Sequence, residues 1–432
     1  MKALISSGTT PDALKSVITR LYEEYGIEEF LVIGTGKSIY NYEDIKKFGD
    51  FKVEVNVGLS ESDFNRNIES LKSLLKDIDV VDLTGGTKAM AGSIGIASIL
   101  LNKPVSYLEG PTEYFKSYYP FTPRTLQRFS IYGKISGNKK KLKFEENFPN
   151  ETNYLDFPKI FSYIFNYLTV NGDYTLKIDF KGNRDASKLY DLSTDEMAWK
   201  SLEKALQSLG TVIMGNGYYA NLSKGLNCNY GYENRNDLTL DFLTNVGYCT
   251  LTGEGLDQLR DKLVIVDTNV LFTYDFVKIN PRHYITIDCV KEEISHKSSD
   301  EKNPFARLAI YKLDSLGFYV EDYKNCIEEG SKNVKNKCDA CLITYVERLP
   351  NYLSDDVVFL TRDKNLYGSF SQKTKIKRIL LKEKKADYER GRGYYSFFKL
   401  LYLYVILTGE SVKMENVMIE PGNRDKVNIK LT

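Results

Sequence analysis

The sequence has little imbalance of charge and no long apolar run. Its 432 residues carry 59 Lys and Arg against 58 Asp and Glu, a net charge of +1. A protein that coats nucleic acid non-specifically is more basic, so we expect any nucleic-acid contact in a local patch or cleft. The longest apolar stretch, Tyr394 to Leu407, is interrupted by Lys399, and no leader-like segment opens the chain. We therefore expect a cytoplasmic protein with no membrane partner.

Cysteine is also scarce. Six cysteines in a chain of this length do not make a disulfide framework, and we expect them to be small buried side chains in a reducing compartment. Cys338 and Cys341 form a CxxC pair, but no second pair stands at zinc-ribbon spacing and Asp339 lies inside the motif. Zinc and redox chemistry are therefore not favoured there.

The length predicts two or three cores, and the fold class is predicted as α/β. In 1–145, strands alternate with helical patterns, which predicts a parallel, Rossmann-like sheet. The expected strands contain KALISS, FLVIGTG, VEVNVG, VVDLTGG and PVSYLEG. A second α/β domain is expected at 261–432, where the strand-like segments are LVIVD, YITID, GFYVED, DVVFLT and RILLK.

The middle domain, 146–260, is expected to be an α+β or winged-helix-like linker. Its end, FLTNVGYCTLTGEGLDQLRDKL, is similar to the helix, strand and wing of a winged helix. A structural spacer made from the same local pieces is an equally good interpretation. This segment contributes no catalytic motif of its own.

Four acidic residues of the last domain lie near strand ends or on the helices that follow. Asp267 ends LVIVD, with Asn269 two positions on, and Glu293 lies on the helix after YITID. Asp339 is expected at a helix start, and Asp363 follows VVFLT, with Thr361 beside it. Strand ends of an open α/β sheet converge on one crevice, so these acids are expected to meet.

Clustered carboxylates repel, and a hard divalent cation such as Mg²⁺ or Mn²⁺ is their natural partner. Such a site can hydrolyse phosphodiesters without a nucleophilic side chain. The alternative is that each acid is ordinary. Asp267, Asp339 and Asp363 would then be cap or turn residues and Glu293 part of a solvated helix face.

In this order the four motifs resemble the PIN-domain family. The matching segments are VDTN, the Val290 to Ile294 segment VKEEI, DACLI and LTRD, within 263–382. The resemblance implies a PIN-like α/β domain with metal-dependent cleavage of RNA, or of DNA in some members. It assigns catalysis and metal binding to Asp267, Glu293, Asp339 and Asp363. Glu292 competes with Glu293, which we prefer because the family's Glu directly precedes an aliphatic residue.

Past Asp363 the chain becomes basic and aromatic. Nine Lys and Arg residues between 373 and 392 are followed by Tyr394 and Tyr395. Such a strip could hold a phosphate backbone while the rings stack on unpaired bases. A solvated surface before a buried final helix is the other interpretation.

Two loops of the first domain are rich in small residues. TGGTK, from Thr84 to Lys88, follows one expected strand and opens a helix, where backbone N–H groups and the helix N-terminus favour a phosphate. SSGTTP ends the first strand, and parallel-sheet geometry places both loops on one edge. GTGKS at Gly34 is not a phosphate-binding Walker loop, because Leu31 stands where its first Gly is required.

These two loops resemble those of the CARF family, the CRISPR-associated Rossmann-fold sensors, over about residues 1–120. The resemblance implies a homodimer that binds one cyclic oligoadenylate, made when a type III CRISPR complex detects foreign RNA. The implied ligand contacts are Ser7, Gly8, Thr9, Thr10, Thr84, Gly85, Gly86, Thr87, Lys88 and Met90. Many CARF proteins carry a HEPN nuclease with an Arg-x4–6-His motif. Neither His283 nor His296 has an arginine at that spacing before it.

The sequence therefore predicts a cyclic-oligoadenylate-activated, metal-dependent nuclease whose substrate is RNA or possibly DNA. Two alternatives remain open. The first is a ligand-responsive transcription regulator, in which the Rossmann domain binds a nucleotide, the middle domain reads DNA and the PIN-like domain is inactive. The second is a sensor domain that degrades its own cyclic ligand.

Overall fold

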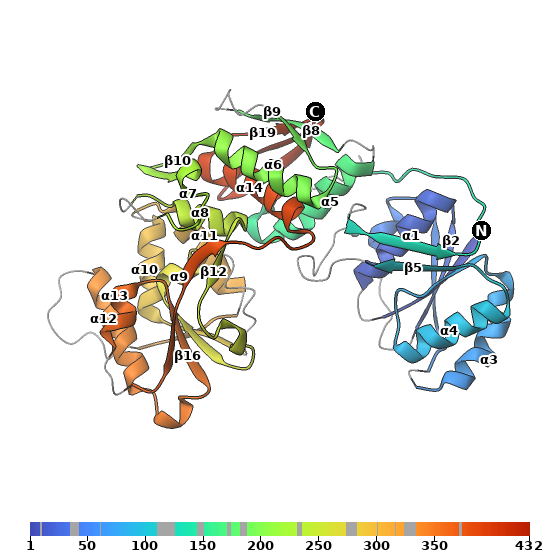
Figure 1. Ribbon diagram of the computed structural model, residues 1–432, viewed down its shortest axis with the longest axis horizontal. Coiled ribbons are helices and arrows are strands. Elements are labelled where there is room, and N and C mark those ends of the chain that lie inside the picture. The colour runs from blue at the N-terminus through green and yellow to red at the C-terminus, as the bar shows by residue number, and fades with distance from the viewer. Residues whose placement is uncertain are drawn as a thin grey trace.

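The computed structural model describes most of the chain. The described residues are 1–8, 11–34, 43–60, 62–109, 126–144, 151–170, 174–181, 188–230, 236–273, 283–299, 301–315, 317–323, 334–370 and 374–432. Thr9 and Thr10, two predicted ligand contacts, lie outside them. The fold is mixed α/β with two parallel-stranded sheets, as predicted. Figure 1 shows the N-terminal unit at one end and the unit with the four acids at the other.

The N-terminal unit is a six-stranded Rossmann-like sheet in the order β3-β2-β1-β4-β5-β6. The first five strands are parallel, and β6 runs antiparallel to β5. The strands are β1 (Lys2–Ser6), β2 (Glu29–Gly34), β3 (Lys52–Val57), β4 (Val80–Asp82), β5 (Val105–Glu109) and β6 (Arg128–Tyr132). All five predicted strands are present.

Helices cover both faces of this sheet, and its central strands β1, β2 and β4 are accordingly buried on both sides. One face packs on α1 (Pro11–Tyr25) and α2 (Glu43–Lys46). The other packs on α3 (Phe64–Leu74) and α4 (Lys88–Leu100).

The middle unit is built around an antiparallel sheet that draws on two distant parts of the chain. Its order is β7-β21-β20-β19-β8-β9. Three strands come early: β7 (Glu151–Asn153), β8 (Thr175–Phe180) and β9 (Lys188–Asp191). The others end the chain: β19 (Val412–Met414), β20 (Val417–Pro421) and β21 (Lys426–Leu431). The C-terminal unit therefore does not extend over 261–432, because residues 412–431 pair with strands of the middle unit.

Helix α14 (Arg392–Thr408) also belongs to the middle unit. It packs on α5 (Phe157–Val170), α6 (Asp195–Leu209) and α8 (Thr239–Val246). Residues 392–407 of α14 are all buried, so Tyr394 and Tyr395 are core side chains. The predicted stacking of these two rings on bases is wrong, because residues 392–407 are packed inside the protein.

The winged-helix interpretation is also wrong for α8. Every residue of this helix is buried, so it presents no face to the major groove of DNA. The hairpin β10 (Thr211–Gly215) and β11 (Tyr218–Asn221) and the short helix α7 (Leu222–Gly225) precede it. After it, β12 (Cys249–Thr252) pairs antiparallel with β18 (Lys382–Lys385). The segment is a spacer that packs directly on the C-terminal unit.

The unit with the four acids, called the acidic unit below, has a five-stranded parallel sheet in the order β15-β14-β13-β16-β17. Its strands are β13 (Leu263–Val266), β14 (His283–Ile287), β15 (Tyr319–Glu321), β16 (Val357–Thr361) and β17 (Lys377–Leu380). Its helices are α9 (Thr268–Leu271), α10 (Asp288–Ser299), α11 (Pro304–Ser315), α12 (Val334–Arg348) and α13 (Lys364–Ser369). The chain order reverses between β13 and β16, which are adjacent in the sheet.

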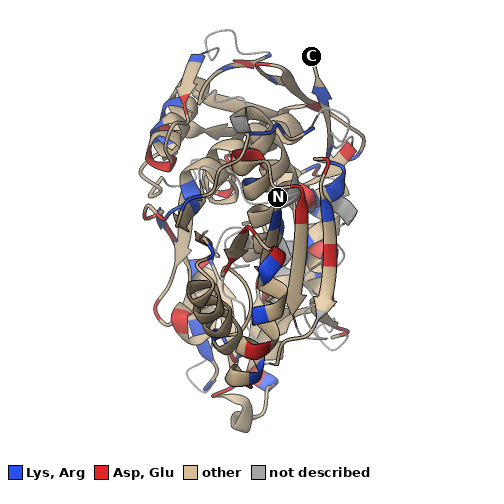
Figure 2. Ribbon diagram, turned by 90° about the vertical axis from the view of Figure 1, so that its right-hand side faces the viewer, with Lys and Arg blue, Asp and Glu red and all other residues tan. Residues whose placement is uncertain are grey.

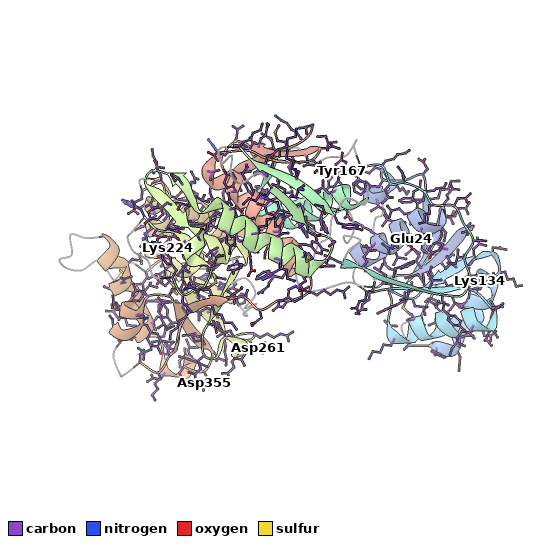
Figure 3. The ribbon with its side chains drawn as sticks, turned by 45° about the horizontal axis from the view of Figure 1, so that its top comes forward. Glu24, Lys134, Tyr167, Lys224, Asp261 and Asp355 are labelled. Atoms are coloured by element: carbon purple, nitrogen blue, oxygen red, sulfur yellow. A yellow bond between two sulfur atoms is a disulfide. The ribbon has the colours of Figure 1, made fainter. Side chains whose placement is uncertain are left out.

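The middle and acidic units share one continuous hydrophobic core. The N-terminal unit has its own cores, but Tyr163 of α5 enters one of them and donates a hydrogen bond to the Phe144 carbonyl at 2.7 Å. Figure 3 shows this division, with Glu24 and Lys134 in the N-terminal unit, well apart from Asp261 and Asp355 in the acidic unit. The middle unit therefore connects the other two.

One cysteine expectation is overturned. Cys228, just past α7, and Cys249, which opens β12, form a disulfide with a Cα–Cα distance of 5.7 Å. Cys341 is also disulfide-bonded, whereas Cys289 and Cys338 are free thiols. The sequence gives no sign of the first pairing, because α8 and its turns bring together residues 21 positions apart.

Acidic and basic residues are interspersed along the ribbon in the view of Figure 2. Several cations of the predicted basic strip have acidic neighbours, such as Lys385 with Glu203 at 2.6 Å and Lys384 with Asp387 at 3.1 Å. Within the described ranges, no helix is both long enough and apolar enough to cross a bilayer.

Candidate functional site

The carboxyl ends of β13 and β16 form the centre of the predicted acidic site. Both strands are buried apolar segments, and each places a polar residue where it ends. Asp267 directly follows β13 and begins α9, and Thr361 is the last residue of β16. The Thr361 hydroxyl donates a hydrogen bond to Oδ2 of Asp267 at 2.8 Å. This is the point of chain reversal where open α/β sheets bind ligands.

Asp267 is a buried carboxyl, with 4% of the residue exposed. Burial, with smaller contributions from the negative charges of Asp339 and Glu293, raises its pKa to about 7, against the hydrogen bond from Thr361. Asp339 and Glu293 therefore lie close enough to Asp267 to repel its charge.

Glu293 lies on α10 and is also buried. Its Oε2 accepts a hydrogen bond from the Thr268 hydroxyl at 2.6 Å, and its Oε1 lies 2.5 Å from Lys297 Nζ. Glu292, the competing candidate, is exposed. Thr268 therefore joins Glu293 to the residue that follows Asp267.

Asp339 and Asp363 approach the site differently. Helix α12 starts at Val334, so Asp339 lies in its second turn and not at the expected helix start. Asp363 caps α13, where its Oδ1 accepts the backbone N–H groups of Asn365 at 2.7 Å and Leu366 at 3.2 Å. Its own N–H donates to the Thr361 hydroxyl at 2.9 Å. Asp363 is thus joined to Asp267 through Thr361.

The acidic side chains of this site are oxygen donors of the kind that a hard divalent cation prefers. Asp267, Glu293 and Asp339 offer carboxylate oxygens, which Mg²⁺ and Mn²⁺ prefer, and a cation would relieve their mutual repulsion. The carboxylates are not already gathered into a ligating cluster. Across the described ranges, no three His, Cys, Asp or Glu side chains are arranged to hold a metal ion.

The two loops of the N-terminal unit meet at one sheet edge, as predicted. The Ser6 hydroxyl donates to the Gly85 carbonyl at 2.6 Å. A Cβ on Gly8 would lie 2.8 Å from the Gly86 backbone nitrogen, and one on Gly85 would strike the Ser6 carbonyl. Gly86 has a φ of +88°, which favours glycine. Small residues are therefore required for the two backbones to approach.

The predicted ligand residues of these loops fall into two groups. Thr87 and Lys88 are exposed at the start of α4, and Gly8, Thr84, Gly85 and Gly86 are half-buried. Ser7 is 2% exposed and Met90 1%, and Met90 packs in the core beneath α4. The exposed loop atoms are thus better placed for a ligand than the side chains of Ser7 and Met90.

Hydrogen bonds hold the second loop in place. Thr84 Oγ1 accepts the Leu108 N–H at 2.8 Å, and Thr87 Oγ1 accepts the Met90 N–H at 3.3 Å. The buried Asp82 carboxylate accepts the Thr84 N–H and the Ser106 hydroxyl, both at 2.8 Å. Burial raises the pKa of Asp82 to about 6 against these hydrogen bonds. The loop is therefore built as a rigid platform at the helix N-terminus.

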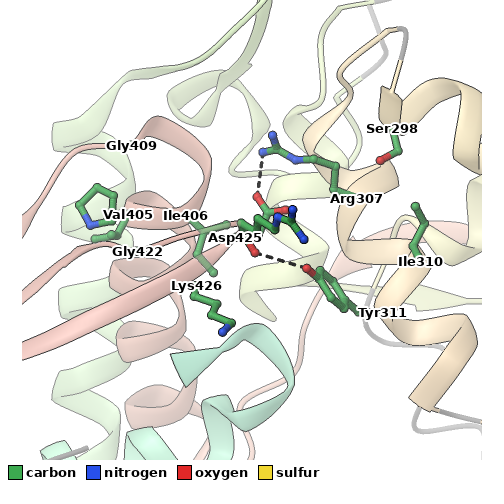
Figure 4. Close-up of a pocket in the computed structure, with 12 residues that line it drawn as sticks. Ser298, Arg307, Ile310, Tyr311, Val405, Ile406, Gly409, Gly422, Asp425 and Lys426 are labelled. Atoms are coloured by element: carbon green, nitrogen blue, oxygen red, sulfur yellow. Dashed lines mark hydrogen bonds and ion pairs between the residues drawn. The ribbon is translucent and has the colours of Figure 1, made fainter. Parts of the chain in front are cut away.

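A cavity of about 570 Å³ lies elsewhere, where α11 faces the turn between β20 and β21. Figure 4 shows Arg307 paired with Asp425 there, at 3.0 Å, and the Tyr311 hydroxyl on a backbone carbonyl, that of Arg424. None of the predicted site residues lines it. It is a junction between the acidic and middle units.

Sequence reasoning missed the supporting residues of the acidic site. Lys297 was detectable, since it stands four positions after Glu293 on one helix. Thr268 adjoins Asp267 but has no motif of its own. Arg362, between Thr361 and Asp363, binds residues of other elements, as described below, and no local pattern signals those partners.

The chain was compared with known proteins. No family model and no curated protein matches it. Can2 from Sulfobacillus thermosulfidooxidans, solved with cyclic tetra-adenylate, aligns at 11% identity and TM-score 0.24 over 33% of this chain and 38% of that one. Enterococcus italicus Csm6, bound to cyclic hexa-2'-fluoro-hexa-dAMP, aligns at 15% identity and TM-score 0.21, over 26% and 34% of the two chains.

A UDP-N-acetylglucosamine 2-epimerase candidate from Listeria monocytogenes aligns at 9% identity and TM-score 0.20, over 84% of this chain and 75% of that one. The chain thus spans little more than a third of the lengths of Can2 and Csm6. All three TM-scores lie below 0.5.

Proposed function

We propose that the protein is a metal-dependent nuclease that cleaves RNA. A cyclic oligoadenylate would activate it in type III CRISPR antiviral defence. The nuclease part of this proposal rests on the position of Asp267. Its buried carboxyl lies at the chain reversal of a parallel sheet, where the negative charges of Glu293 and Asp339 repel it. Residues that served only to stabilise the fold would not place two further acids beside a buried carboxyl.

Mg²⁺ or Mn²⁺ would be held by Asp267, Glu293 and Asp339, with Asp363 beside them. When bound, such an ion supplies polarisation of a phosphodiester and activation of water. The neighbouring hydroxyls orient the acids, since Thr361 donates to Asp267 and Thr268 donates to Glu293. Without a bound ion, Lys297 neutralises part of the negative charge through its ion pair with Glu293.

The sensor part of the proposal rests on the two meeting loops and on their resemblance to CARF loops. Gly85, Gly86 and Thr87 offer backbone at the start of α4, with the exposed Lys88 as a cation. Such a platform fits the phosphates of an anionic nucleotide. Cyclic oligoadenylate carries several phosphates, so two copies of the platform would share one ring.

A homodimer is supported by α4. Its Ile96, Ile99 and Leu100 are 42%, 71% and 64% exposed. An apolar helix face of this kind marks an interaction site in a water-soluble unit. A second copy of α4 would cover it and would bring two ligand loops to one axis.

Cleavage assays test the nuclease proposal directly. Labelled RNA and labelled DNA are incubated with the protein, Mn²⁺ and each cyclic oligoadenylate, in parallel with Asp267→Asn and Asp363→Asn. We expect cleavage by the wild type and its loss with either variant or with chelator. If either variant cuts at the wild-type rate, the acidic site is not the active site. Operator binding by the metal-free protein would instead favour the transcription regulator.

A further inference from the structure

Arg362 ties the two loops of the acidic site to each other. It lies between Thr361 and Asp363, and its backbone N–H donates to Oδ1 of Asn269 at 3.1 Å. Its guanidinium also donates to the Asn269 carbonyl at 3.0 Å. Asn269 is two residues from Asp267, so one arginine joins the loop after β13 to the loop after β16.

The same guanidinium is held from outside the acidic unit. Its Nη1 donates to Oδ1 of Asp241, on α8, at 2.6 Å. Its Nε donates to Glu383, on β18, at 2.7 Å, and Nη2 pairs with the same carboxylate. The side chains of Arg362 and Asp241 are 7% and 6% exposed. A buried arginine fork fixed by two carboxylates has little freedom to turn.

Helix α8 also holds the far end of α9. Asn245 lies one turn after Asp241, and its Nδ2 donates to the Phe272 carbonyl, where α9 ends, at 2.6 Å. Its Oδ1 accepts hydrogen bonds from Tyr154 at 3.0 Å and Lys312 at 3.3 Å. Lys312 in turn donates to the Leu271 carbonyl at 3.2 Å. Helix α9, which directly follows Asp267, is thus held by α8 at its far end through Asn245 and near its start through Arg362.

We propose that Arg362 is a positioning residue, through which α8 of the middle unit sets the distance between Asp267 and Asp363. This inference rests on the proposed function and deepens it by naming how the middle unit reaches the active site. The middle unit would act on the site through this fork, since loss of the Asp241 contact would free the arginine that joins the two loops. Arg362 itself touches neither substrate nor the reacting atoms in this role.

The test compares Arg362→Lys and Asp241→Asn with Arg307→Lys. Arg307 is a matched control, because it also pairs with a carboxylate where the acidic and middle units meet, at 3.0 Å from Asp425, but away from the acids. Mn²⁺ affinity is measured by calorimetry on the full chain without nucleic acid. Loss of a residue that orients metal ligands weakens metal binding about 10–100-fold. We expect that loss for the first two variants and less than about a twofold change for the control.

Cleavage at limiting and saturating Mn²⁺ separates positioning from direct catalysis. A positioning role predicts that saturating Mn²⁺ restores most of the rate of Arg362→Lys. Unchanged Mn²⁺ affinity with a rate that saturating metal does not restore would overturn the proposal and place Arg362 on the substrate. If Arg362→Lys does not fold, Glu383→Gln, at the 15% exposed rim of the same cluster, takes its place.

Hydrogen exchange keeps this inference separate from the nuclease proposal. Metal-free wild type and variants are compared at the amides of α9. Faster exchange in Arg362→Lys and Asp241→Asn, but not in Arg307→Lys, supports positioning even if the wild type binds no Mn²⁺. Equal exchange in all four proteins overturns it, whatever the cleavage assays show.

Discussion

The buried Asp267 carboxylate carries an electrostatic penalty that depends on pH. Its pKa of about 7 in the folded protein lies above the ordinary value of 3.8. The folded state therefore favours the protonated carboxyl, and metal-free protein should lose stability as pH rises from about 4 to about 7. At about 1.36 kcal/mol per pH unit, the full loss is at most about 4 kcal/mol.

Asp267→Asn should remove this loss. Without metal, the variant should match the wild type near pH 4 and be more stable at pH 8, by up to about 4 kcal/mol. Urea unfolding with chelator present measures the difference. Asp355→Asn serves as control, because Asp355 is exposed at the other end of the same sheet, just before β16. If the unfolding free energies of the wild type and Asp267→Asn change with pH in parallel, folding does not raise the pKa of this carboxyl.

Lys88 gives the corresponding prediction for the ligand loop. Lys88→Ala removes a charge-assisted contact with phosphate, about 1.5–3 kcal/mol per site, and a dimer loses it twice. Binding of cyclic oligoadenylates should fall steeply in calorimetry, while any basal cleavage persists. Lys72→Ala on α3, whose lysine pairs with Glu69, should bind as the wild type does. Lost basal cleavage with unchanged ligand affinity would contradict the sensor assignment.

At the residue scale, local sequence predicted the strand-end acids but not what orients them. Asp267 and Thr361 follow buried apolar strands, and that pattern is readable because parallel strands end at one edge. One carboxylate partner of Arg362 is Asp241, which stands 121 positions earlier. No spacing rule spans such a distance, so this part of the site needed the tertiary structure.

Among the elements, α4 carries the dimer prediction. Ile99 is 71% exposed at the centre of its apolar face. Ile99→Asp should turn the dimer into a monomer, because a buried unpaired carboxylate is costly at an interface. Sedimentation measures the change, and Ile213→Asp, at a 70% exposed isoleucine of the β10–β11 hairpin, is the control. Equal masses for all three proteins would place any dimer interface elsewhere.

Elements with strong local patterns were predicted, and those defined by distant partners were not. The strands of both parallel sheets follow from short apolar runs between turns. The winged-helix interpretation of α8 was wrong, because it used the order of local pieces and could not detect that the helix is buried on all sides. The last three strands were misplaced, since β21 pairs with β7 across more than half of the chain.

The whole molecule is organised around the middle unit. It shares one core with the acidic unit, and α5 extends from Tyr163, in the N-terminal core, towards Tyr154, which binds Asn245 of α8. A fragment that starts at Asp261 would retain α14 without α5, α6 and α8. The acidic unit is therefore not separable by one cut at that point, and regulation has to be studied in the full chain.

We propose that ligand binding at the N-terminal loops switches the acidic site. To move an equilibrium from about 1:99 to 99:1, a ligand must favour the active state by roughly 5.5 kcal/mol. We propose that a cyclic ligand with several phosphates, held by two loop platforms, would supply this through its charged contacts.

The most direct measurement is the single-turnover rate of RNA cleavage by the full-length protein with Mn²⁺, with and without each cyclic oligoadenylate. A population shift of that size predicts a rise of about 100-fold with the matching ring, and no rise for Asp267→Asn. Equal rates with and without every cyclic oligoadenylate would contradict the account.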